Sequence, residues 1–194
     1  MKIFLLIFFL LLHKQNQCQT IPVLKILYER KIDGKLTDVW EVWMNKDFIF
    51  RFNSKDSNEN SVLNFNTNSI TINAFGRENT QSIEERKDSS TYRLFDVGDI
   101  MMYISKPEAG VNPFTNQVIS ETTDSIWFDK KTVIPRFKKG GFSSFLDNGF
   151  GLLPTRFVRN IKNFQESTDK IIELILIAKQ NIEIDEKIFI KYTL

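Results

Sequence analysis

Short runs that alternate between apolar and polar residues, separated by turn-forming residues, make up most of this chain. Val23 to Lys31 is the first such run, and Leu36 to Met44 is the second. Asp33 and Gly34 lie between them, and this dipeptide is a strong signal for a two-residue type I′ hairpin turn, in which both positions need a positive φ. The pattern therefore predicts a β-hairpin at the start of the domain.

The alternation continues beyond this hairpin. Phe48 to Phe52 puts three phenylalanines on one face of a strand and Arg51 on the other. Lys170 to Lys179 has helical spacing as well as near-alternation, and its β-branched content favours a buried strand over the alternative of a helix. Further strands are predicted at residues 62–65, 70–74, 92–97, 100–104, 118–122, 126–128, 132–137, 157–163, 182–185 and 188–192, and residues 81–87 form a strand or an irregular link.

These elements predict an all-β fold, with one helix if Lys170–Lys179 is helical. Short turns between about ten strands indicate a curved antiparallel meander that forms an incomplete barrel. No linker, repeat or low-complexity tract divides the sequence after residue 19. Residues 20–194 are therefore expected to form a single β-rich domain.

Residues 1–19 have a different character. Lys2 precedes an unbroken apolar run from Ile3 to Leu12, and a polar stretch leads to Gln19. This is the pattern of a secretory signal peptide, and ten apolar residues form a helix of only about 15 Å, too short for a hydrocarbon core of about 30 Å. We expect export to the periplasm or the cell exterior and no transmembrane segment in the mature chain. A lipid anchor through Cys18 is the alternative.

The loss of residues 1–19 would remove both His13 and Cys18, the one histidine and the one cysteine of the sequence. Nucleophiles activated by histidine, and zinc sites built from imidazole or thiolate, are then excluded. Lys2 and Lys14 leave with this segment, so the 26 basic and 24 acidic residues of the full chain become equal in number. A balanced charge argues against a nucleic-acid-binding protein, which needs a basic face.

Carboxylates are the remaining catalytic groups. Asp124 and Asp129 are near in sequence, but residues five apart in a strand point to opposite faces, so the two side chains are not expected to converge. Residues 56–60 carry oxygen ligands for calcium without the glycine and spacing of the known loop. We therefore predict no catalytic residues, no metal site and no cofactor.

The aromatic content suggests a binding surface. Phenylalanines flank glycines in the range 138–154, where a role in the core is less obvious than in a strand. The hypothesis is that this segment is a flap over an apolar interior. The residues predicted to contact an apolar ligand are Phe142, Phe145, Phe150 and Trp40. The alternative is that these aromatic residues only fill the core.

Basic residues adjoin the Gly140-Gly141 pair in the same segment. Consecutive backbone N–H groups can converge on an anion where glycine allows unusual φ values. The residues predicted to contact an anion are Arg136, Lys138 and Lys139. A solvated glycine loop is the alternative.

Several motifs occur in a familiar order. Residues Ser125 to Asp129 read SIWFD, Gly151 to Phe157 read GLLPTRF, and Ile184 to Phe189 read IDEKIF. In this order the sequence resembles small secreted bacterial proteins with a lipoprotein-carrier-like (LolA-like) sheet, and it is distantly similar to the family named for its GLPGLI motif. GLLPTRF departs from that motif. The resemblance implies a curved, incompletely closed antiparallel sheet whose apolar concave face takes up acyl chains, and it implies no catalytic residues.

Two functions follow as expectations. The first is an exported, non-catalytic binding or carrier module with an apolar concave surface for lipid or acyl chains. The alternative is an envelope-associated structural or interaction protein that pairs with another envelope protein by a sheet edge. A third reading is an enzyme that relies on carboxylates, lysine or tyrosine. An apolar groove would favour the first, an exposed straight edge the second, and two convergent carboxylates the third.

Overall fold

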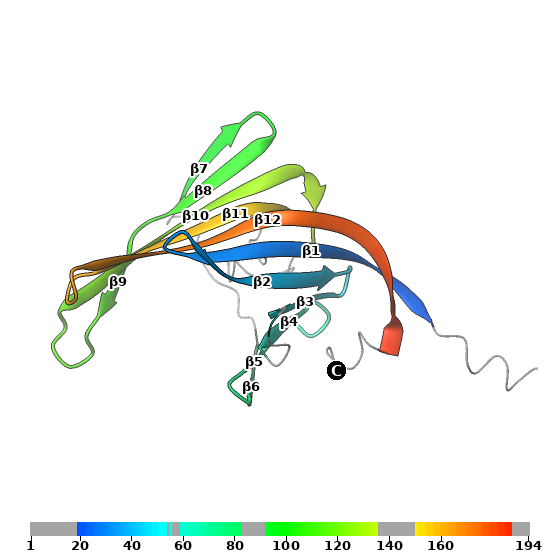
Figure 1. The fold of residues 1–194 in the computed structure, drawn as a ribbon, viewed down its shortest axis with the longest axis horizontal. Coiled ribbons are helices and arrows are strands. Elements are labelled where there is room, and N and C mark those ends of the chain that lie inside the picture. The colour runs from blue at the N-terminus through cyan, green and yellow to red at the C-terminus, as the bar shows by residue number, and fades with distance from the viewer. Residues whose placement is uncertain (1–18, 54, 56–58, 83–91, 136–149, 188–194) are drawn as a thin grey trace, which may run out of the picture.

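The structure is a computed structural model that describes residues 19–53, 55, 59–82, 92–135 and 150–187. Within these ranges, twelve strands form one antiparallel sheet that is not closed into a barrel (Figure 1). The strands are β1 (Thr20–Ile32), β2 (Lys35–Met44), β3 (Phe48–Asn53), β4 (Asn60–Asn64), β5 (Ser69–Ala74), β6 (Arg77–Ser82), β7 (Tyr92–Val97), β8 (Ile100–Ser105), β9 (Glu108–Val111), β10 (Val118–Val133), β11 (Leu152–Asn163) and β12 (Thr168–Asp185).

The strand order divides the sheet into two meanders. It reads β6-β5-β4-β3-β2-β1-β12-β11-β10-β8-β7, with β9 paired to β10 beside this path. Strands β1 to β6 thus form one half and β7 to β12 the other. The halves meet where β1 pairs with β12 along its whole length, from Thr20 opposite Asp185 to Ile32 opposite Ile172.

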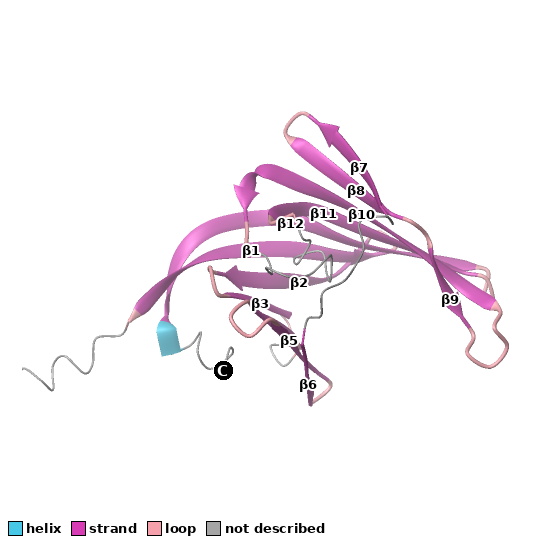
Figure 2. Cartoon of the chain, turned by 180° about the vertical axis from the view of Figure 1, so that it is seen from behind, coloured by secondary structure: helices cyan, strands magenta, loops and turns pink. Residues whose placement is uncertain are grey.

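Covalent geometry requires this sheet to curve. The outer edges are β6 and β7, and these two strands are consecutive in the chain, with ten residue steps from Ser82 to Tyr92. Ten steps of extended chain reach at most about 36 Å. Eleven strands laid flat at about 4.8 Å spacing would hold the edges about 48 Å apart. The arched sheet of Figures 1 and 2 satisfies this limit.

One face of the sheet carries the core. Ile126 of β10 lies between Tyr103 of β8 and Phe157 of β11, and Phe157 pairs in turn with Leu174 of β12. These four apolar side chains form a row across the sheet, and all are buried. Tyr28 of β1 lies on this face and donates across β12 to the Pro154 carbonyl of β11 at 2.8 Å. A contact over two strand spacings fits the side toward which the arched sheet curls, so this is the concave face. Further members of the core are Ile26, Tyr28, Val42, Met44, Ile49, Leu63, Phe128, Ile134 and Leu153.

Two local predictions are confirmed. Asp33 and Gly34 have φ values of 51° and 78°, as a type I′ turn requires. Lys170–Lys179 is a strand inside β12, as predicted, but it is not a buried one, because Leu174 is its one buried residue. In the described ranges, helical geometry occurs at Glu186 and Lys187, after β12 (Figure 2), and no helix there is long and apolar enough to cross a membrane.

Other predictions need correction. The described sheet has twelve strands, against a predicted total of about ten. Strand β9 and most of β6 were not predicted, because neither segment shows clear alternation. The three short strands predicted between residues 118 and 137 are one long strand, β10, which ends at Val133. The predicted signal peptide lies outside the described residues except for Gln19.

The convex face is also covered near β3. Phe50 and Phe52 stack with ring centroids 5.1 Å apart, and Trp43 meets both rings edge-on at 6.1 and 5.3 Å. Phe50 is only 2% exposed. This agrees with the prediction that Phe50 and Phe52 share one face and Arg51 lies on the other. Strand β3 is therefore buried on both faces.

Truncation of this aromatic cluster should destabilise the protein. We expect Phe50→Ala to lower the free energy of unfolding by about 3–5 kcal/mol, because a buried ring leaves a cavity. Phe75→Ala is the matched control, since Phe75 is 97% exposed, and it should change stability by less than about 0.5 kcal/mol. Urea unfolding of both variants measures the difference. Equal stabilities would contradict the burial of Phe50.

A hydrogen-bond network links the end of β10 to β12. Asp129 accepts hydrogen bonds from the Lys131 N–H at 2.8 Å, the Thr132 hydroxyl at 2.6 Å and the Lys179 ammonium at 3.1 Å. Lys179 also donates to Thr132 Oγ1 at 2.8 Å. The bond from Thr132 contributes most to lowering the pKa of Asp129 from 3.8 to about 2, against a smaller opposing effect of burial.

This network predicts an acid-sensitive contribution to stability. A carboxyl group whose pKa is lower in the folded than in the unfolded state stabilises the fold above the unfolded pKa. The contribution should therefore be complete above about pH 4 and lost as the pH falls toward about 2. We expect the difference in melting temperature between the wild type and Asp129→Asn to shrink over that interval. Asp99→Asn, in an exposed pair with Lys131, is the control and should show a smaller difference at every pH.

Candidate functional site

A polar cluster interrupts the apolar concave face. Asp38, Asn53 and Ser61 are the buried polar residues within the described ranges, at 7%, 8% and 2% exposure. They lie on β2, β3 and β4, and the strand register places them on the same face as the core. The name concave polar cluster is used below for these three residues together with Arg30, Trp40 and Arg51.

The strand register explains why these side chains meet. Arg30 of β1 pairs with Asp38 of β2, and Trp40 of β2 pairs with Asn53 of β3. Arg51 pairs with Val42 on one side and Ser61 on the other. Because side chains alternate between faces, all of these residues project to the concave side. The cluster is thus built from four adjacent strands of the N-terminal half.

Arg30 and Asp38 form the first ion pair of the cluster. Arg30 Nη1 lies 3.1 Å from Asp38 Oδ2. The other carboxylate oxygen, Asp38 Oδ1, is buried and has no hydrogen-bond partner. An unpartnered buried acceptor costs free energy unless a water or a ligand supplies a donor. Asp38 therefore has one oxygen available to a bound group.

Arg51 is the least satisfied member of the cluster. Its Cζ lies 4.6 Å from the centroid of the Trp40 ring, so its side chain leans along the sheet toward Asp38. Its Nε is buried without a hydrogen-bond partner, and it forms no ion pair within 4.0 Å with a described carboxylate. Burial lowers the pKa of the Arg51 guanidinium, nearby Glu59 raises it, and the positive charge of Arg30 lowers it. Two guanidinium groups thus repel each other across the cluster.

Glu59 and Asn53 close one side of the cluster. Asn53 Nδ2 donates to Glu59 Oε2 at 3.2 Å, and the two backbones are joined by a 3.1 Å hydrogen bond. The Lys55 N–H donates to Asn53 Oδ1 at 2.9 Å, and the Lys55 ammonium donates to the Thr37 carbonyl at 2.5 Å. These bonds hold a carboxylate near Arg51 without letting it form an ion pair.

A second arginine on the concave face shows the contrast. Arg159 Nε and Nη2 donate to the two oxygens of Asp124 at 2.8 and 2.7 Å, and its Cζ lies 5.5 Å from the Phe157 ring centroid. The hydrogen bond with Asp124 is the main cause of the raised pKa of Arg159. Arg159 is therefore stacked on an aromatic ring like Arg51, but its donors are paired. Arg51 is stacked and unpaired.

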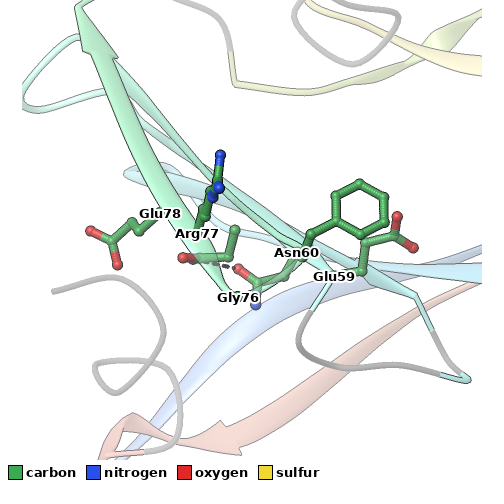
Figure 3. Close-up of a pocket in the computed structure, with 7 residues that line it drawn as sticks. Glu59, Asn60, Gly76, Arg77 and Glu78 are labelled. Atoms are coloured by element: carbon green, nitrogen blue, oxygen red, sulfur yellow. Dashed lines mark hydrogen bonds between the residues drawn. The ribbon is translucent and has the colours of Figure 1, made fainter.

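A surface depression lies at the β5–β6 turn, beside Glu59 (Figure 3). Phe75 forms that turn with a φ of 53°, which is unusual for a bulky residue, and its ring is 97% exposed. Glu59 and Glu78 lie on opposite sides of the depression and do not converge, so they form no acid–base pair. The lining residues are Glu59, Asn60, Asn73, Phe75, Gly76, Arg77 and Glu78.

The residues predicted from the sequence are partly placed by the structure. Trp40 belongs to the concave polar cluster. Phe150 packs against Phe128 and Tyr103, with ring centroids 5.5 and 6.1 Å away, in the C-terminal half of the sheet. These contacts do not bring Trp40 and Phe150 together. The other candidates, Phe142, Phe145, Arg136, Lys138 and Lys139, lie outside the described residues.

The other carboxylates of interest are engaged separately. Asp124 pairs with Arg159, and Asp129 pairs with Lys179. Among the described residues, no three side chains of histidine, cysteine, aspartate or glutamate come together in a way that could hold a metal ion. The arrangement of the concave polar cluster suits recognition of a polar group by hydrogen bonds and charge.

Sequence reasoning did not identify Arg51 or Asp38. Arg51 was expected on the face opposite the phenylalanines of β3, and that assignment is correct. That face is not the solvent-exposed side of the strand, because it is the face that carries the core. The available signal was a lone arginine beside Trp40 on neighbouring strands, which is a weak signal without the register.

Comparisons with known proteins give no family. No known protein family matches the sequence, and no curated protein matches it. Among solved structures, a structure of PNGF-II in space group C2 is 15% identical, with a TM-score of 0.47 over 90% of this chain and 30% of that chain. A structure of PNGF-II in space group P21 is 16% identical, with a TM-score of 0.45 over 87% of this chain and 30% of that chain. The chain thus spans about 30% of the length of PNGF-II, and a likeness this distant carries no argument about function.

The contrast between the two arginines predicts opposite effects on stability. Arg51→Met keeps an apolar stem on Trp40 and removes a half-buried charge that has no ion-pair partner among the described residues. The free energy of unfolding should therefore stay the same or rise by up to about 1 kcal/mol. Arg159→Met leaves Asp124 without its partner. Because the Arg159 side chain is 43% exposed, we expect a loss of no more than about 1 kcal/mol. Thermal unfolding of both variants tests this, and a larger loss for Arg51→Met than for Arg159→Met would contradict it.

Proposed function

We propose that this chain is an exported, non-catalytic binding or carrier module whose ligand lies on the concave face of the sheet. The observation that carries the proposal is a set of apolar side chains on that face which pack against the core and are still partly exposed. This set comprises Leu24, Trp40, Phe65, Ile70, Met101 and Leu176. Apolar surface of this kind at a concave site is typical of ligand-binding sites.

The open sheet gives such a ligand a way in. The edges β6 and β7 are not paired with each other, so the concave face is not enclosed by a barrel wall. A closed barrel of similar strand number would restrict entry to its two ends. An apolar ligand can therefore approach along the partly exposed residues at the border of the core.

The pairing of the carboxylates favours binding over catalysis. Asp38, Asp124 and Asp129 each lie within 3.1 Å of a cationic nitrogen, on Arg30, Arg159 and Lys179 respectively. A carboxyl group that acts as a general acid near neutral pH needs a raised pKa, and a glycosidase needs a second carboxylate across the cleft. The pKa of Asp129 is instead lowered.

The edge-pairing function is a second candidate, and the β7–β8 hairpin favours it. Leu94, Phe95 and Ile100 are 53%, 41% and 51% exposed on this hairpin, which projects from the sheet in Figure 1. Strand β6, at the opposite edge, exposes only polar side chains. An apolar edge strand is a template for pairing with a strand of another protein.

Native mass spectrometry of protein purified from its own envelope fraction tests the two functions. A carrier should retain an apolar adduct, whereas an edge-pairing protein should retain another polypeptide. Titration with the neutral fluorophore N-phenyl-1-naphthylamine then locates the surface. Trp40→Ala should weaken its binding severalfold, and Phe114→Ala, which removes a 94% exposed ring in the turn between β9 and β10, should leave it unchanged. Absence of both an adduct and fluorophore binding would refute the carrier function.

A further inference from the structure

We propose that the concave polar cluster binds the oxyanionic head group of a single-chain amphiphile, with Arg51 as its main contact. This inference rests on the proposed function, because it assigns a head-group site to the same concave face. The shared chemistry is that of a carboxylate or a phosphate monoester. The acyl chain lies along the partly exposed apolar side chains beside the cluster, among them Trp40 and Leu176.

The unpaired donors of Arg51 are the first support. A guanidinium presents five N–H donors in a planar fork that matches the oxygens of a carboxylate or phosphate. Arg159 shows this match on the same face, with two parallel bonds to Asp124. Arg51 is stacked in the same manner but has no carboxylate in contact, and its Nε is buried without a partner. Arg51 is half-buried, and a bound oxyanion would pair the guanidinium donors that the described residues leave unpaired.

The charge of the cluster is the second support. The charge of Arg30 acts on Arg51, and Asp38 is the one described carboxylate that forms an ion pair with either arginine. Glu59 lies near Arg51, and Lys55 donates to the Thr37 carbonyl beside Arg30. The cluster and its immediate surroundings thus contain three cationic side chains and two carboxylates, which leaves an excess of positive charge. A bound oxyanion relieves the repulsion between the guanidinium groups, and Asp38 Oδ1 can accept a hydrogen bond from a water or a hydroxyl of the head group.

The strand register links the cluster to an apolar row. Leu174 pairs with Phe157 on one side and with Arg30 on the other. The row that runs from Tyr103 through Ile126 therefore continues without a break into the Arg30–Asp38 pair. Four strand spacings from β8 to β1 amount to about 19 Å. The row itself is buried, but Leu176 and Trp40, which flank Tyr28 on the same face, are partly exposed and offer an acyl chain a surface next to the cluster.

The test compares amphiphiles that share one chain and differ in the head group. The experiment measures how well each amphiphile displaces N-phenyl-1-naphthylamine from the full chain at neutral pH and below its micelle concentration. The four probes are dodecanoate, dodecyl phosphate, dodecanol and dodecyltrimethylammonium. The wild type should bind dodecanoate or dodecyl phosphate about tenfold more tightly than dodecanol, as one charge-assisted pairing provides. The cationic amphiphile should bind most weakly. The two anionic probes distinguish a carboxylate from a phosphate as the preferred head group.

Variants connect this preference to Arg51. Arg51→Met should reduce the tenfold preference to about one without changing the affinity for dodecanol, while Arg51→Lys should keep part of it because the charge remains. Arg159→Met, which removes the stacked but paired arginine, should keep the whole preference. Melting curves confirm that each variant is folded.

The outcomes separate the two proposals. If the wild type binds dodecanol as tightly as it binds dodecanoate and dodecyl phosphate, the head-group site is overturned and the carrier function stands. An anion preference that survives in Arg51→Met overturns the role of Arg51. Failure of all four amphiphiles to displace the fluorophore, or failure of the fluorophore itself to bind, overturns the carrier function and the head-group site together.

Discussion

The ladder between β1 and β12 is the interaction on which the rest of the structure depends. It joins two meanders that otherwise pair only within themselves in the described part of the chain. The same ladder aligns Leu174 with Arg30, so it brings the apolar row of one half against the charged end of the other. Curvature follows from the short link between the outer edges, and burial of the concave face follows from curvature. The concave polar cluster is a consequence of the β1–β12 ladder, the curvature of the sheet and the burial of its concave face.

The cluster shows how a fold with no disulfide can combine stability and recognition. Most of the concave face is apolar and buried, as a core must be. One group of polar side chains, which includes Arg30, Asp38 and Arg51, lies on β1–β4 at one end of the row. Arg159 and Asp124 satisfy each other, whereas Arg51 and one oxygen of Asp38 remain unsatisfied. The free energy lost in burying unpaired groups is recovered only when a ligand pairs them.

Local chemistry made part of this fold predictable. The Asp33-Gly34 turn and the strand at Lys170–Lys179 follow from backbone preference and β-branching alone. Strand β6 has no apolar residue and therefore shows no alternation that could predict it. The sequence pattern predicts several short strands in place of β10, because the polar residues from Glu121 to Asp124 interrupt its alternation. The burial of Arg51 and Asp38 depends on curvature and register, which no local pattern contains. A lone charge in a strand is ordinarily assigned to solvent.

The position of β1 has a consequence for how the chain acquires its structure. Every pair in the central ladder joins residues far apart in sequence, such as Thr20 and Asp185. Contacts of this separation slow folding, because a long loop must close before any of them forms. As the chain emerges with its N-terminus first, β1 presents an open edge until nearly all of the remaining chain has followed. We therefore expect the nascent protein to need protection of that edge by a chaperone until β12 arrives.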